Sequence, residues 1–247
     1  MNDQPFEILG PERTSRWLVT CDHAANRVPG AVLPDGLGLA ECDMERHIAY
    51  DLGAAGLAGA LAERLGSPAI LSRFSRLVID PNRGELDPTL VMQLYDGTII
   101  PANRILPETE VERRLTLLYR PYHRALADLA ARQGDTVVVA IHSFTRQLRG
   151  KEPRPWAVGI LYAPRDPRLS HPLIRRLSAA PDLCIGDNQP YAGVLPGDAI
   201  DRHALQMGRQ NTLIEVRNDL IATGPDQQHW ADILAPALTA ALADAET

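Results

Sequence analysis

Two histidines stand at the ends of predicted strands. His23 is separated by two residues from the apolar segment 17–20, and His142 directly follows the apolar run of residues 136–141. Ligands of open α/β sheets bind at the carboxyl ends of the strands, so both imidazoles are expected at one edge, where they can share a metal ion. The alternative is that each histidine is a strand-end residue satisfied by a backbone hydrogen bond.

A catalytic zinc ion usually has three protein ligands and one water. Glu45 is our candidate for the third ligand, because a helix predicted over residues 44–65 places it at the start of a buried stripe with Ile48 and Leu52. A carboxylate there needs a partner, either a metal ion or an arginine. Asp43, which also suits a helix cap, and His47 on a neighbouring stripe remain alternatives.

Glu215 is the candidate general base. It lies in the strand predicted over residues 212–217, on the same face as Arg217. A carboxylate at this end of a sheet can deprotonate a metal-activated water and then protonate the leaving amine. The alternative is a Glu215–Arg217 ion pair on a solvated edge.

Basic residues near the same predicted edge can bind a carboxylate substrate. Asn82 and Arg83 open a long loop after a predicted strand, and guanidinium groups bind carboxylates in a bidentate manner. Further candidates are Arg73, Arg76, Arg202 and His203. The alternative is that these arginines are solvated surface residues.

Other catalytic chemistries are less well supported. The sequence has no Gly-x-Ser-x-Gly elbow around Ser143, and Cys21 lies in an apolar run where a thiol is usually inert. It also lacks a Gly-x-Gly-x-x-Gly or Walker loop, so a nucleotide cofactor is not indicated.

Short apolar segments alternate with amphipathic ones, which predicts an α/β fold. Strands are expected at residues 17–21, 69–74, 76–80, 136–141, 157–162, 183–185 and 212–217. Helices are expected at residues 44–65, 108–133, 172–179 and 230–243. Long loops at residues 24–41, 81–106, 143–155 and 186–199 separate them, and loops of this length are often functional.

The composition is that of an ordinary globular protein. Residues 1–247 show no linker, so a single domain is expected. The net charge of −6 argues against a nucleic-acid partner, and the absence of an apolar run near ~18 residues argues against a membrane span. Three scattered cysteines and an N-terminus without an apolar leader predict a cytoplasmic protein.

Six segments together resemble the N-formylglutamate amidohydrolase family. They cover roughly residues 20 to 221 and read CDHAANRVPG, ERHIAYDLGAAGLA, LSRFSRLVIDPNRG, AIHSFTRQLRG, GDNQPYAG and NTLIEVRNDLI. The resemblance implies a mixed, mostly parallel sheet flanked by helices, like that of the zinc carboxypeptidases and other phosphorylase/hydrolase-like folds. It also implies one Zn²⁺ ion and hydrolysis of N-formyl-L-glutamate to formate and L-glutamate, late in histidine breakdown.

The same resemblance assigns roles to residues. It puts His23, Glu45 and His142 at metal-ligand positions, Glu215 at the position of the base, and Asn82-Arg83 where a substrate carboxylate is held. One departure concerns the carboxylate ligand: a carboxypeptidase-type site uses a His-x-x-Glu segment, and the position three residues after His23 is Asn26 here.

The function expected from the sequence is therefore metal-dependent hydrolysis of a small acidic N-acyl amino acid. One alternative is an amidase or peptidase that acts on another N-acyl amino acid or a small peptide. The other is a non-catalytic relative that binds a small molecule or a metal without turnover.

Overall fold

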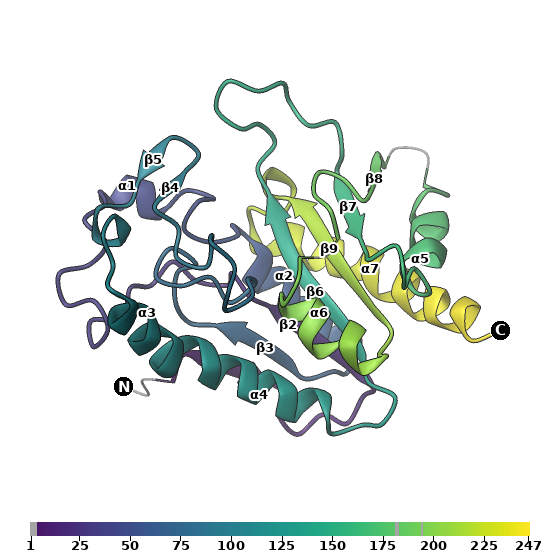
Figure 1. Cartoon of the computed structure of the whole chain (residues 1–247). Coiled ribbons are helices and arrows are strands. Elements are labelled where there is room, and N and C mark those ends of the chain that lie inside the picture. Colours follow the sequence, from purple (N-terminus) through teal and green to yellow (C-terminus); the bar gives the residue numbers. More distant parts are fainter. Residues whose placement is uncertain (1–3, 181–182, 194) are drawn as a thin grey trace.

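A mixed β-sheet forms the centre of the protein (Figure 1). The computed structural model describes residues 4–180, 183–193 and 195–247; parts of the N-terminal segment and of the predicted loop 186–199 lie outside it. Within those ranges seven strands run in the order β1-β3-β2-β6-β9-β7-β8. They are β1 (Phe6–Leu9), β2 (Trp17–Cys21), β3 (Ala69–Ser72), β6 (Val137–Phe144), β7 (Val158–Leu161), β8 (Ile185–Asp187) and β9 (Asn211–Arg217).

The four central strands β3, β2, β6 and β9 are parallel, so their carboxyl ends meet at one edge of the sheet. Strand β1 is antiparallel to β3, and β7, which pairs in parallel with β8, is antiparallel to β9. The predicted fold class, a mixed and mostly parallel sheet flanked by helices, is confirmed. The short edge strand β1 was missed by the sequence analysis.

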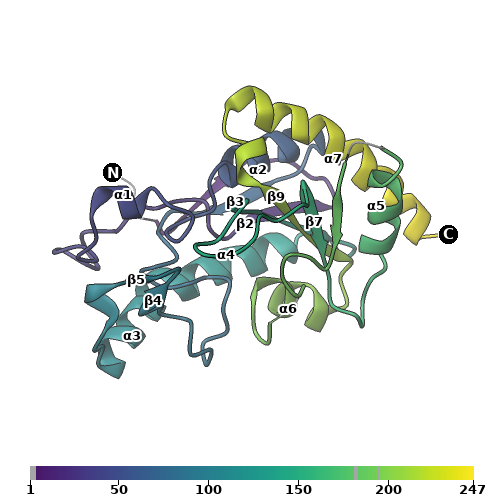
Figure 2. The ribbon, with the colours of Figure 1, turned by 90° about the horizontal axis from the view of Figure 1, so that it is seen from above.

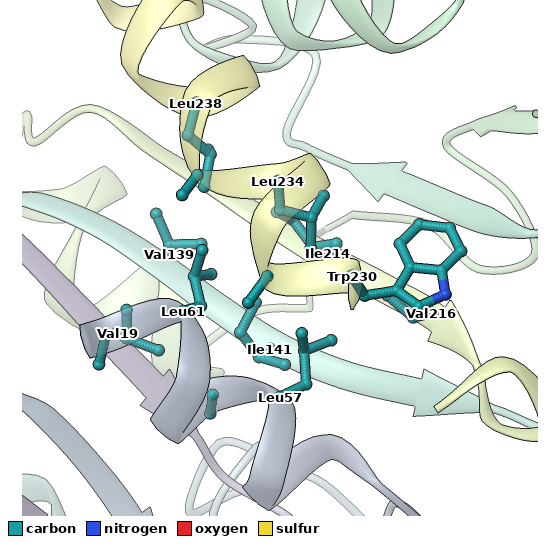
Figure 3. Close-up of a cluster of buried hydrophobic side chains, with 14 of the residues drawn as sticks. Val19, Leu57, Leu61, Val139, Ile141, Ile214, Val216, Trp230, Leu234 and Leu238 are labelled. Carbon is teal, nitrogen blue, oxygen red and sulfur yellow. The ribbon is translucent and has the colours of Figure 1, made fainter. Parts of the chain in front are cut away.

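Helices cover both faces of the sheet (Figure 2). Helices α2 (Ala54–Arg64), α5 (Ser170–Leu177) and α7 (Gly224–Ala245) lie on one face, and α4 (Arg120–Ala130) and α6 (Ala199–His203) lie on the other. Figure 3 shows Leu57 and Leu61 of α2 and Leu234 of α7 against strand residues such as Val139. Each fully buried side chain of this size stabilises the fold by about 1.5–3 kcal/mol.

Helix α7 is longer and better anchored than the sequence predicted. Thr223 and Asp226 form a reciprocal capping box at its start, and it extends to Ala245. Leu238 and Leu242 are buried near its C-terminal end, so the alanine-rich tail packs on the sheet. The described helices include none that is long and apolar enough to cross a bilayer.

Two predicted elements differ from those in the structure. The helix expected at residues 108–133 is present as α3 (Glu108–Arg114), a π-helical turn over Leu115–Tyr119 and α4. Pro121, which lacks an amide hydrogen, lies just after that turn. The strand expected at residues 76–80 is wrong, because Val78 N donates to Ser75 O and the segment turns instead.

The helix predicted over residues 44–65 is also wrong in its first half. A one-turn helix α1 (Glu41–Met44) ends early, and α2 begins after Gly53. Between them the backbone is used for tertiary contacts: Asp51 N donates to His23 O, and Ala49 O accepts from Ser75 Oγ. In a continuous helix the N–H of Asp51 and the C=O of Ala49 would form hydrogen bonds within the helix instead.

The loop between β3 and α3 contains a small hairpin, β4 (Leu94–Tyr95) and β5 (Thr98–Ile99). Neither this hairpin nor the short helix α6 was predicted from the sequence pattern. Helix α6 lies against α4 through two histidines: His123 Nδ1 is 2.9 Å from His203 Nε2, and the rings stack with centroids 5.2 Å apart. One imidazole donates and the other accepts, which requires the accepting ring to be neutral.

Gly53 should be far less replaceable than Gly66. Both have positive φ angles, but an added Cβ at Gly53 would lie 2.2 Å from Ile221 O, whereas nothing lies within 4 Å at Gly66. We expect Gly66→Ala to cost about 1 kcal/mol of unfolding free energy from backbone strain, and Gly53→Ala about 3 kcal/mol because packing is added. Urea unfolding measures both, and equal losses would contradict this account.

The His123–His203 pair should make stability depend on pH. Burial lowers the pKa of His123 to about 3 and that of His203 to about 4. An unfolded histidine titrates near ~6.5, so the unfolded chain binds more protons and stability falls as the pH decreases through that value. Between pH 6.5 and 5.0 the free energy of unfolding should fall by about 3 kcal/mol more in the native chain than in His123→Gln/His203→Gln. The exposed His229→Gln is the control, and identical pH slopes in all three proteins would refute the assignment.

Candidate metal centre and active site

Two histidines and one aspartate converge at the carboxyl edge of the sheet. His23 follows β2, His142 lies near the end of β6, and Asp51 precedes α2; their ligand atoms all lie within 4.8 Å of one another. Asp51 Oδ2 is 2.8 Å from His142 Nδ1 and 3.3 Å from His23 Nδ1. The structure therefore brings together the two predicted histidines, with a carboxylate that the sequence analysis did not name.

Asp51 is buried and held from several sides. Its Oδ2 also accepts from Ser143 N, and its Oδ1 is 3.5 Å from Arg76 Nη1. Burial alone would raise the pKa of this carboxyl, but the charge of His23 and the hydrogen bonds with His142 and His23 lower it well below its usual value. Asp51 is therefore a negatively charged carboxylate at pH 7 and could act as a metal ligand.

Each histidine has a second carboxylate on its far ring nitrogen. His23 Nε2 is 2.7 Å from Asp80 Oδ1, and Asp80 Oδ2 accepts two hydrogen bonds from Arg76. His142 Nε2 is 3.7 Å from Asp22 Oδ2, while Tyr122 donates its hydroxyl to Asp22 Oδ1. Carboxylates in this position orient metal-binding imidazoles and increase their basicity.

Glu215 lies beside this cluster on β9. The parallel register pairs it with His142, and alternation puts both side chains on the face of the sheet away from α2 and α7. Its Oε2 is buried with no hydrogen-bond partner among the described residues. Burial raises the pKa of Glu215 to about 7, despite the opposing charge of His142. The alternative ion pair with Arg217 is absent, since Arg217 Nε donates to Asp219 instead.

The structure does not bring Glu45 to this cluster. Glu45 is an exposed residue at the C-terminal end of α1 and is not among the residues that line the cavity. The predicted buried stripe does not exist, because the chain leaves the helical path after α1. The same departure carries Asp51 to the histidines, so Asp51 replaces Glu45 as the carboxylate of the proposed metal site.

The two alternatives to Glu45 are also placed elsewhere. Asp43 accepts from Arg46 at 2.8 Å rather than contacting either histidine of the cluster. His47 lines the cavity, but its Nε2 lies 3.5 Å from Asp96 Oδ2.

The predicted substrate-binding residues fall into two groups. Asn82, Arg83 and Arg76 line a cavity of about 290 Å³ together with His23, Asp51, His142 and Glu215. Arg202 and His203 do not: Arg202 Nη2 donates to Tyr119 OH, and His203 stacks on His123 below the sheet. Arg73 is also absent from the cavity lining.

The nucleophiles considered from the sequence do not gain support from the geometry. Cys21 is completely buried, and its pKa is raised well above the usual value by burial and by nearby carboxylates. Ser143 Oγ donates to Leu52 O. Neither side chain is activated by a neighbouring base.

The donor set of the cluster fits a divalent transition metal such as zinc. Two imidazole nitrogens and one carboxylate oxygen are a common zinc set with a position left for water. His23 Nδ1 and His142 Nδ1 both face Asp51 Oδ2, and Glu215 Oε2 beside them is buried without a hydrogen-bond partner in the described part of the chain.

Comparisons with solved structures support the fold. The gene product Atu2144 from Agrobacterium tumefaciens has a TM-score of 0.92 and 32% identity, with 99% of this chain and 97% of that chain covered. The N-formylglutamate amidohydrolase from Ralstonia eutropha JMP134 has a TM-score of 0.70 and 22% identity, with 98% and 97% covered. A bacteriophage poly-gamma-glutamate hydrolase shares the fold at a TM-score of 0.51 and 11% identity, with 98% and 89% covered.

The family comparison agrees with the resemblance seen in the sequence. None of the curated proteins matches the chain. The model of the family described as N-formylglutamate amidohydrolase matches residues 15–222, which is most of the chain. This protein therefore belongs to the N-formylglutamate amidohydrolase family.

Proposed function

We propose that this protein is a metal-dependent amidohydrolase that removes the N-acyl group, in the simplest case formyl, from an amino acid. The observation that carries the proposal is the buried cluster of His23, Asp51 and His142 with the unpartnered carboxylate of Glu215 beside it. Membership of an amidohydrolase family supports the reaction class.

The residues of the cluster have distinct roles in this proposal. His23 Nδ1, His142 Nδ1 and Asp51 Oδ2 would hold one Zn²⁺ ion, and Asp80 and Asp22 would orient the two imidazoles. The bound ion supplies Lewis acidity, which polarises the amide carbonyl and lowers the pKa of a water molecule.

Glu215 is the proton carrier. A carboxylate with a pKa near 7 takes the proton of the attacking water and gives it to the departing nitrogen. The desolvation that raises the pKa of Glu215 makes it a stronger base than an exposed carboxylate would be. Its position next to His142 puts it at the same end of the cavity as the metal-binding groups.

Arg83 and Asn82 would hold the carboxylate of the substrate. The guanidinium of Arg83 is fixed by bonds from Nε to Thr89 Oγ1 and from Nη1 to Asn82 O. The sequence predicted N-formyl-L-glutamate as substrate, with further arginines to bind a second carboxylate. Because Arg202 and Arg73 are not in the cavity lining, the proposal is made for N-acyl amino acids as a class, and N-formyl amino acids are the probes.

Glu215→Gln should retain zinc and lose turnover. The amide keeps the size of the side chain but cannot accept a proton, so formate release should fall by about 10²–10⁴-fold. Zinc content by elemental analysis and formate release from N-formyl amino acids are measured on the same preparation. A variant without zinc would make Glu215 a ligand, and a fully active variant would remove it from the mechanism.

Zinc affinity should fall more when the carboxylate of Asp51 is removed than when that of Asp80 is removed. Asp51→Asn removes an anionic donor and should weaken zinc binding most, whereas Asp80→Asn acts through His23 and should weaken it by about 10–100-fold. Competition with a chromophoric chelator gives the affinities without reference to activity. Asp198→Asn is the matched control, because Asp198 lines the same cavity without a hydrogen bond to either histidine of the cluster. Equal zinc affinities in all four proteins would refute the proposed site.

A further inference from the structure

One part of the cavity wall beyond the proposed metal-binding groups is apolar. Leu213 on β9, Leu161 on β7 and Phe144 at the end of β6 contribute buried side chains, and Tyr191 and Leu195 contribute more exposed ones. We propose that the amino acid released by this protein carries an apolar side chain, of about the size of leucine or phenylalanine, and a single carboxylate held by Arg83. This inference rests on the proposed function and names its substrate class.

The positive charge in the cavity supports one substrate carboxylate rather than two. Arg76 donates from Nε and Nη2 to Asp80 Oδ2, lies 3.5 Å from Asp51 Oδ1, and has the ring of Tyr95 over its guanidinium at 5.4 Å. Its positive charge therefore neutralises the buried carboxylates of Asp80 and Asp51. In the described part of the chain Arg83 donates from Nε and Nη1, which leaves Nη2 without a described partner and suited to a ligand carboxylate.

Neither His47 nor Arg154, the other basic residues near the cavity, is placed to bind a second substrate carboxylate. Burial lowers the pKa of His47, and the nearby guanidinium of Arg46 adds to the effect despite Asp96, so His47 is neutral at pH 7. Arg154 lies behind the wall: its guanidinium covers the rings of Tyr191 and Phe144 at 5.0 and 5.7 Å, and Nη1 donates to Tyr191 OH.

The apolar part of the cavity disfavours a second carboxylate. Leu213, Leu161 and Phe144 line it, and their side chains cannot donate hydrogen bonds to a carboxylate. A glutamate side chain entering the apolar part would lose its hydration without gaining a described cationic partner, which is an unfavourable transfer. An apolar side chain in the same place would instead be removed from water, which is favourable.

The size of the cavity restricts the ligand further. A volume of about 290 Å³ is near the lower limit of small-molecule pockets, which span about 300–1,000 Å³. The cavity therefore suits a single acylated amino acid better than a peptide. The apolar wall then has room for one side chain in addition to the scissile amide and the carboxylate.

The first test is a substrate series on the purified, zinc-loaded protein. Formate release is measured from N-formyl derivatives of glycine, L-leucine, L-phenylalanine and L-glutamate. A single methylene group in a hydrophobic pocket gives about 10- to 200-fold discrimination, so kcat/KM for leucine and phenylalanine should exceed that for glycine by at least about 10-fold. The glutamate derivative should be no better than glycine, and a preference for glutamate would overturn the inference.

Binding separates this inference from the proposed function. Calorimetry on zinc-loaded Glu215→Gln measures affinity for the same four compounds whether or not turnover occurs. N-formyl-L-leucine should bind at least about 10-fold more tightly than N-formyl-L-glutamate. The reverse order overturns the substrate class. Tight binding of the apolar compounds with no hydrolysis by the native protein overturns the proposed reaction alone.

Variants of the wall provide the third test. Tyr191 is 41% exposed, so Tyr191→Ala should fold, and it should reduce the preference for phenylalanine over glycine by about 10-fold. Leu195→Arg should shift the preference toward glutamate by placing a cation in the apolar wall. Tyr162→Ala is the control, because Tyr162 lies outside the cavity and pairs with Asp187. An unchanged preference in the first two variants would contradict the assignment of the wall.

Discussion

The site depends on one buried carboxylate oxygen, Asp51 Oδ2, which faces two histidines that different strands supply. An isolated carboxylate in this position would be strongly destabilising, because burial removes its hydration. Its charge is balanced by the imidazoles, by Ser143 N and by Arg76. Asp51 N also donates to His23 O, so the backbone and the side chain of one residue tie the segment before α2 to the end of β2.

This requirement explains why the chain between α1 and α2 is not helical. A helix through Asp51 would satisfy its backbone internally and direct its side chain along the helix surface. Instead Gly53, with a positive φ angle, lets the chain turn directly into α2, and Ile221 O occupies the space where a side chain would be. Packing of α2 against the sheet and placement of the carboxylate of the proposed metal site are therefore achieved by the same turn.

The sequence predicted what depends on local pattern. Apolar runs located the central strands, and His23, His142 and Glu215 could be assigned to one edge because parallel strands share their carboxyl ends. Asp51 and Asp80 could not be found in this way. The stripe of Ile48 and Leu52 continued into α2 and concealed the break, and Asp80 gains its role only through contacts 57 residues distant in the chain. Likewise, residue type did not distinguish Arg83, which lines the cavity, from Arg202, which contacts Tyr119.

The number of arginines near a site is therefore a poor guide to the charge of its ligand. Arg76 lies in the cavity wall, yet it neutralises Asp80 and Asp51, which in turn hold the histidines. Its charge stabilises the carboxylates of the proposed metal site, and removing it would leave two buried carboxylates without sufficient compensating charge. What a substrate encounters is the charge that remains after such internal pairs are formed. Here Arg83 keeps one guanidinium edge for a ligand while Leu213, Leu161 and Phe144 form an apolar part of the wall, and the inference of a monocarboxylate substrate rests on that combination.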